Sequence, residues 1–136
     1  MKTALDTNIL VGLALGATDR SRFEKSRDAV SRALADGHEL EVTECVLCET
    51  VWVLESRYGL PRATVARRLG EIVGTPEVRG WDETLAAAAL ALLAGEPALD
   101  VADCILAARA ALTDGAVLTF DRHLEKVMRG VEVVEI

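Results

Sequence analysis

The first fifteen residues most restrict what this chain can fold into, because they join a short apolar run to a charge and a helical pattern. Residues 3–5 form a run that suits a buried strand, Asp6 ends it, and residues 8–15 follow with the apolar spacing of a helix. In open α/β sheets, ligands collect at the carboxyl ends of the strands, where Asp6 is expected to lie. A carboxylate among apolar neighbours is costly to bury without a partner or a metal. Asp6 could instead simply cap the helix that follows it.

The same alternation of strand and helix continues along the chain. Strands are expected at 1–5, 40–43, 78–81, 116–120 and 131–136, with 116–120 as the clearest buried strand. Helices are expected at 8–15, 21–35 and 45–54, after Pro61, from Asp82 to about 94, at 100–113 and from Asp121 to about 128. This order predicts an α/β fold in which a parallel sheet lies between helices.

Length, composition and charge narrow the class of protein. The 136 residues, of which 51% are hydrophobic, suit one domain with a single core. No apolar run approaches the roughly 20 residues of a membrane span, and no secretory signal is evident. Three cysteines favour a reducing, cytosolic setting. A net charge of −7 argues against broad nucleic-acid binding, although carboxylates that hold a divalent cation can face a phosphate through it.

Four carboxylates sit alone inside otherwise apolar runs. They are Asp6, Glu49, Asp103 and Asp121. Asp6 and Asp121 follow predicted parallel strands and should project from the same edge of the sheet. Glu49 lies early in a predicted helix, and Asp103 lies at the start of another. All four could therefore converge on one crevice.

Carboxylates gathered in one cleft repel one another and have raised pKa values. A hard divalent cation resolves that repulsion, and Mg²⁺ and Mn²⁺ prefer oxygen ligands. Such a site suits metal-assisted hydrolysis of a phosphodiester. Ala107 and Ala110, one and two turns after Asp103, predict a smooth face that something can approach closely.

Each acid also has a structural alternative. Asp103 could complete a capping box headed by Asp100, and Asp121 could cap the last helix. A structural role is harder to find for Glu49, because it caps neither end of its predicted helix. A separate alternative is the Cys45-x-x-Cys48 spacing, which thiol redox proteins share.

Four segments carry a resemblance to a known family. In chain order they are Ala4-Leu-Asp-Thr-Asn8, Thr43-x5-Glu49-x2-Trp-Val-Leu54, Asp100-Val-Ala-Asp-Cys-Ile-Leu-Ala-Ala108 and Val117-Leu-Thr-Phe-Asp121. Together they resemble a PIN domain, and in particular the VapC-like toxins of bacterial and archaeal toxin–antitoxin pairs. The resemblance covers nearly the whole chain. No single segment is specific, but the ordered set is.

The resemblance implies a PIN-like three-layer sandwich, with a parallel sheet of about four to five strands between helices. It implies an endoribonuclease dependent on Mg²⁺ or Mn²⁺, with the four lone acids as metal-binding and catalytic residues. Asn8 and Thr119 match positions that support the family's site. Many members carry a further acid two residues after the fourth one, where this chain has His123, which could touch metal or phosphate instead.

The resemblance also implies partners, namely an RNA substrate, a second copy of the chain in a homodimer, and a cognate antitoxin. The Tyr58–Arg68 hairpin between two apolar helices offers exposed arginines and a groove for an apolar peptide helix. Two other functions stay open, a catalytically weak PIN-like binding module and a thiol redox protein that uses Cys45 and Cys48. No membrane role is expected.

Overall fold

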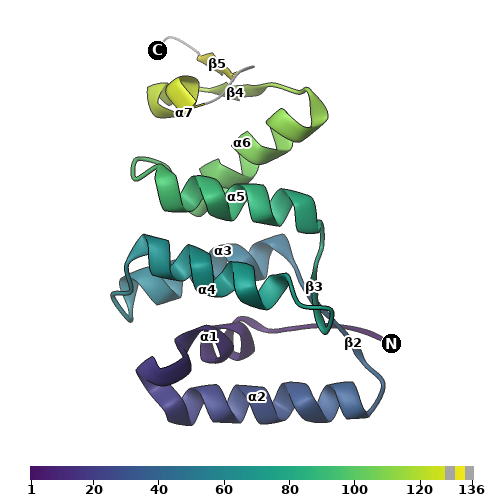
Figure 1. Cartoon of the computed structure of the whole chain (residues 1–136). Coiled ribbons are helices and arrows are strands. Elements are labelled where there is room, and N and C mark those ends of the chain that lie inside the picture. The colour runs from purple at the N-terminus through teal and green to yellow at the C-terminus, as the bar shows by residue number, and fades with distance from the viewer. Residues whose placement is uncertain (128–130, 134–136) are drawn as a thin grey trace.

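The structure is a computed structural model that describes residues 1–127 and 131–133. The elements are β1 (Lys2–Ala4), α1 (Thr7–Leu15), the 3-10 helix η1 (Gly16–Asp19), α2 (Arg20–Ala35), β2 (Glu39–Val42), α3 (Glu44–Ser56), α4 (Arg62–Val73), β3 (Val78–Gly80), α5 (Glu83–Gly95), α6 (Val101–Thr113), β4 (Val117–Thr119), α7 (Arg122–Val127) and β5 (Val131–Val133). The predicted α/β class with parallel strands is confirmed (Figure 1).

The strands fall into two parallel sheets. The larger sheet has the order β1-β2-β3, with Thr3 opposite Leu40 and Leu40 opposite Val78. β4 and β5 pair only with each other, so the main sheet has fewer strands than the four to five expected. Figure 1 shows β4 and β5 beyond α6, at the far end of the helical stack from α2. In the described part of the chain, β1 and β4 therefore each keep one free edge.

Helix boundaries follow from capping side chains that are visible in the sequence. Asp6, Thr43, Asp82 and Asp100 each accept a hydrogen bond from a backbone N–H in the first turn of α1, α3, α5 and α6. Such caps satisfy donors that a helix start leaves without a partner. Pro61 stands at the N-cap of α4, one residue before the helix it was expected to open.

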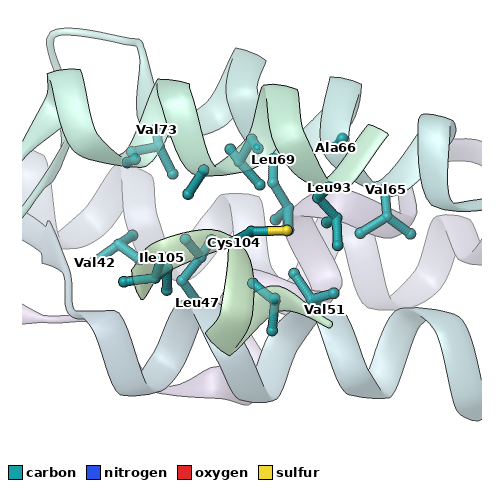
Figure 2. Packing of buried hydrophobic residues seen from close by; sticks show 14 of the residues in the cluster. Val42, Leu47, Val51, Val65, Ala66, Leu69, Val73, Leu93, Cys104 and Ile105 are labelled. Carbon is teal, nitrogen blue, oxygen red and sulfur yellow. The ribbon is translucent and has the colours of Figure 1, made fainter. Parts of the chain in front are cut away.

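The hydrophobic core joins β2 to α3, α4, α5 and α6. Leu47, Leu69 and Leu93 are fully buried, and Figure 2 shows the Cys104 sulfur among the aliphatic side chains of this cluster. Each buried leucine contributes roughly 1.5–3 kcal/mol relative to an exposed one. Aliphatic side chains, and not aromatic rings, fill most of this core.

The expectation that 116–120 is the clearest buried strand is wrong. Val117 is buried, but Leu118 is 73% exposed and Phe120 is 61% exposed. The reason is that β4 pairs with β5 alone, so its second edge and the Leu118 face lack the cover that a strand inside a larger sheet receives.

His38 links β1 to the start of β2, because its Nδ1 lies 2.6 Å from Thr3 Oγ1. The expected end of the last helix at Met128 and the strand residues 134–136 lie outside the described residues. Among the residues that are described, no helix is long and apolar enough to cross a membrane.

Candidate active site

Asp103 lies in the first turn of α6, where it forms a capping box with Asp100. The Asp100 carboxylate accepts the Asp103 N–H at 2.8 Å, and Asp103 Oδ2 accepts the Asp100 N–H at 3.4 Å. The structural alternative expected for Asp103 is therefore present. The second bond is long, so it restrains the Asp103 carboxylate only weakly.

The charge on Asp103 is disfavoured by its surroundings. Partial burial raises the pKa of this carboxyl most, the negative charge of Asp100 raises it further, and Asp121 adds a smaller contribution. The backbone N–H of Asp100 opposes these effects without cancelling them. The charge of Asp121 reaches Asp103, so these two carboxylates lie within electrostatic range of each other.

Asp121 follows β4 directly and is held by its neighbours. Its N–H donates to Thr119 Oγ1 at 3.0 Å, and its Oδ1 accepts the His123 N–H at 2.8 Å. Thr119 thus supports Asp121 through the backbone, while the exposed His123 contributes its N–H rather than its ring. The alternative that Asp121 caps the last helix is also seen here, because that N–H belongs to the first turn of α7.

Glu49 is exposed on α3 and borders a groove between α3 and α6. The groove has a volume of about 700 Å³, and its lining residues are Glu44, Cys45, Cys48, Glu49, Ala102, Ile105, Leu106 and Arg109. Thr43 caps the start of α3, so the helix has no use for Glu49 as a cap. Ala102, the residue that precedes Asp103, lines the same groove from α6.

Asp6 sits at the carboxyl end of β1, as expected, and its Oδ1 accepts the Thr7 N–H at 2.8 Å. Asn8 is exposed in the next turn of the chain. Neither residue joins the Asp103–Asp121 pair. Within residues 1–127 and 131–133, no three Asp, Glu, His or Cys side chains are grouped closely enough to hold a metal ion. Asp6 and Asp121 follow strands of two different sheets, so the expectation that they project from one sheet edge is wrong.

The chemistry of the Asp103–Asp121 pair nevertheless fits a hard divalent cation. Mg²⁺ usually binds proteins through one or two carboxylates and keeps several waters. Two neighbouring acids, one with a raised pKa, offer oxygen ligands whose repulsion a cation would relieve. The alanine face does not provide the expected space beside them, because Ala107 and Ala110 are buried in the core.

The thiols do not have the environment of a redox pair. All three cysteines are free, with Cys45 exposed and Cys48 half-buried. Burial raises the pKa of Cys48, and the neighbouring Cys45, Glu44 and Asp100 raise it further. Reactive cysteines need surroundings that lower the pKa, so Cys48 has the opposite character.

Two arginines of α4 have roles that the sequence did not reveal. The Tyr58–Arg68 hairpin was expected to expose its arginines, but Arg68 Nη1 donates to the Ala14 and Leu15 carbonyls at 3.0 Å each. Arg62 Nη1 similarly donates to carbonyls before α6. Arg67 is exposed, as expected. Because the acceptors are backbone groups distant in sequence, no residue pattern marks them.

Comparison with known proteins places the sequence in a family. The sequence matches the PIN domain over residues 3–130, a span that contains all four lone acids. A search of curated proteins finds no match. PIN domains are generally nucleases, and they generally use divalent metal ions. The chain belongs to the PIN-domain family.

Proposed function

We propose that the protein is a metal-dependent endoribonuclease that cleaves RNA phosphodiester bonds, as the toxin of a type II toxin–antitoxin pair. The observation that carries the proposal is the electrostatic influence of Asp121 on the partly buried Asp103, two lone acids in a PIN-domain chain. Asp6, at the N-cap of α1, and Glu49, on α3, carry the same kind of oxygen ligand outside this pair.

Each residue of the site has a definite task in this proposal. Asp103 and Asp121 would hold Mg²⁺ or Mn²⁺, and Asp6 and Glu49 would complete the site as the free edges of β1 and β4 approach. Once bound, the cation supplies a polarised water and neutralises charge on the scissile phosphate. Thr119 keeps Asp121 oriented through its N–H, and Asn8 follows Asp6 on the solvent side of α1.

The direct test is cleavage of RNA by the purified protein. With Mn²⁺ or Mg²⁺ we expect cleavage that EDTA abolishes and that Asp121→Asn removes. Asp114→Asn is the matched control, because Asp114 is an exposed acid at the other end of α6 and its left-handed backbone suits Asn. Activity that persists in EDTA would exclude the metal mechanism.

A binding module without catalysis is distinguished by metal titration. A module that only binds a partner should show no carboxylate-dependent affinity for Mn²⁺, whereas the proposed nuclease should lose affinity on Asp6→Asn. Mapping the RNA that is cut during brief expression then identifies the substrate.

The partners belong to the same proposal, as a homodimer and an antitoxin whose basic side chain reaches the acids. Support comes from the groove between α3 and α6, where apolar side chains lie beside Glu44 and Glu49. An amphipathic helix with a basic flank is the kind of ligand such a surface accepts. Light scattering that shows only monomer, together with no inhibition by the product of the neighbouring gene, would contradict this part.

A further inference from the structure

Arg62, the first residue of α4, contacts the loop that leads into α6. Its Nη1 donates to the carbonyl oxygens of Glu96 at 3.0 Å and Pro97 at 3.4 Å, and also to that of Leu99. Its Nε lies 3.4 Å from Glu55 Oε1 of α3. The Arg62 side chain is only 26% exposed, so these contacts are largely shielded from water.

The loop has few other polar restraints. The Glu96 N–H donates to the last turn of α5, and the Leu99 N–H closes a turn onto the Glu96 carbonyl at 3.1 Å. Pro97 has no N–H to give. Three carbonyls thus converge on one guanidinium, which satisfies them together and fixes the path of the chain between α5 and α6.

The position of Asp103 depends on where this loop ends. Leu99 is buried, and the next residue, Asp100, is the N-cap whose carboxylate binds the Asp103 N–H. A shift of the loop therefore moves Asp100, and through the capping box it moves Asp103. The hydrogen bond that Asp103 Oδ2 accepts from the Asp100 N–H is long, so the capping box alone is too weak to hold this carboxylate in place.

We propose that Arg62 is a positioning residue, which holds the 96–99 loop and so sets the Asp103 carboxylate for the metal and the phosphate. The inference rests on the proposed nuclease function. Glu55 belongs to the same device, because it balances the charge of Arg62 and directs the guanidinium toward the loop. Arg62 touches neither substrate nor metal, so its effect passes through the backbone of residues 96–100.

The test compares Arg62→Met with Arg62→Lys and with Arg67→Met. Methionine keeps much of the apolar stem without the donors, and lysine restores a charge that can reach the carbonyls. Arg67 is the matched control, since it lies on the same helix and is exposed, with Glu71 as its ion-pair partner at 3.7 Å.

Hydrogen exchange provides a readout that does not depend on activity. We expect Arg62→Met to speed exchange at the amides of Leu99 and Asp103, with Arg62→Lys close to wild type and Arg67→Met unchanged. In RNA cleavage, the Mn²⁺ concentration for half-maximal rate should rise roughly tenfold in Arg62→Met, as for other residues that orient metal ligands. The effect should fall on kcat more than on the KM for RNA.

The outcomes separate this inference from the proposed function. Unchanged exchange at Leu99 and Asp103, or an unchanged Mn²⁺ requirement in an active protein, overturns the positioning role. If the wild type cuts no RNA, the nuclease proposal fails while the exchange result still decides whether Arg62 orders the loop. If Arg62→Met does not fold, Glu55→Gln takes its place, and wild-type exchange at Leu99 and Asp103 with a wild-type Mn²⁺ requirement in that variant overturns the inference.

Discussion

Asp103 combines two tasks in one carboxylate. It closes the capping box of α6 with a long hydrogen bond, and it lies near Asp100 and Asp121, which raise its pKa along with burial. Its ionised form is thus maintained at a cost in free energy of folding. Either protonation or a bound cation would remove that cost.

Replacing Asp103 by Asn should abolish activity while leaving the fold intact. The amide keeps the volume and can still accept the Asp100 N–H, but one negative charge leaves the metal site. We expect a loss of RNA cleavage of about 100-fold or more, since even outer residues of metal sites cost 10–100-fold. Melting curves should show that Mn²⁺ stabilises the wild type, by about 2.7 kcal/mol at 100 times Kd, and stabilises the variant less. An Asp103→Asn protein as active as Asp114→Asn would make Asp103 purely structural.

The stability of the metal-free protein should depend on pH through Asp103. Its pKa in the folded state lies above the ordinary value of 3.8, so the folded protein binds this proton more tightly than the unfolded chain does. The penalty is absent below that ordinary value and grows as pH rises through the folded-state pKa. In EDTA, the stability of wild type relative to Asp103→Asn should therefore fall as the pH rises above about 4. Urea unfolding of both proteins measures this, and a variant that is less stable at pH 6 would contradict it.

The three thiols should react in the order Cys45, Cys48, Cys104. Cys45 is exposed, whereas burial raises the pKa of Cys104 to about 11. At pH 8 roughly one Cys104 in a thousand is then the reactive thiolate. Mass spectrometry after brief alkylation of the native protein checks the order. Equal labelling of Cys45 and Cys104 would show that α6 opens readily from the core.

At the residue scale, the sequence revealed the acids that stand alone in apolar runs. It did not reveal the arginines that donate hydrogen bonds to backbone carbonyls. Asp6 and Asp121 stand at strand ends, as their charge after an apolar run predicted. Glu49 was correctly judged to have no role as a cap. Arg62 could not be found, because its acceptors are carbonyls that every residue carries and only the fold brings them near.

Among the elements, α1 and α2 approach closely at Gly12. A Cβ built at Gly12 would overlap the Ser26 hydroxyl and lie 3.0 Å from the Arg22 carbonyl oxygen. Ser26 is itself buried in this crossing. The two helices therefore need a residue without a side chain at this point.

Gly12→Ala should destabilise the protein by about 1–3 kcal/mol, because overpacking outweighs the better helix propensity of alanine. Gly70→Ala is the control, since Gly70 lies within α4 and its nearest neighbour to an added Cβ is 4.0 Å away. That change should stabilise by up to about 1 kcal/mol. Urea denaturation gives both values, and an increase in stability for Gly12→Ala would show that the helices can separate without loss.

The elements themselves were largely predictable, because caps and apolar spacing are local properties. Asp82 and Asp100 marked the starts of α5 and α6, and the strands appeared in the predicted order. The prediction that failed was the burial of β4, because the hydrophobicity of a strand does not say which strand or helix will pack against it. Sheet neighbours are set by long-range packing, which a run of five residues does not encode.

The whole molecule is divided between two sheets, and this division separates the four acids. If metal binding draws the sheets together, the free edges of β1 and β4 should become protected. The Leu5 N–H already bonds β2, so the alternating Ala4 N–H points to the free edge. We expect Mn²⁺ to slow hydrogen exchange at the Ala4 amide in the wild type, and not in Asp103→Asn. An exchange rate at Ala4 that does not change with Mn²⁺ would show that the sheets stay apart.

The open edge of β4 also bears on how the protein behaves at high concentration. β1 carries Lys2, a charge of the kind that keeps edge strands from pairing with other chains, whereas Val117–Thr119 carries none and exposes Leu118. A bare apolar edge is where one chain adheres to the next. We therefore expect the metal-free protein to aggregate first as its concentration rises, through contacts made by β4. A cation that draws the two sheets together would cover this edge and slow the aggregation.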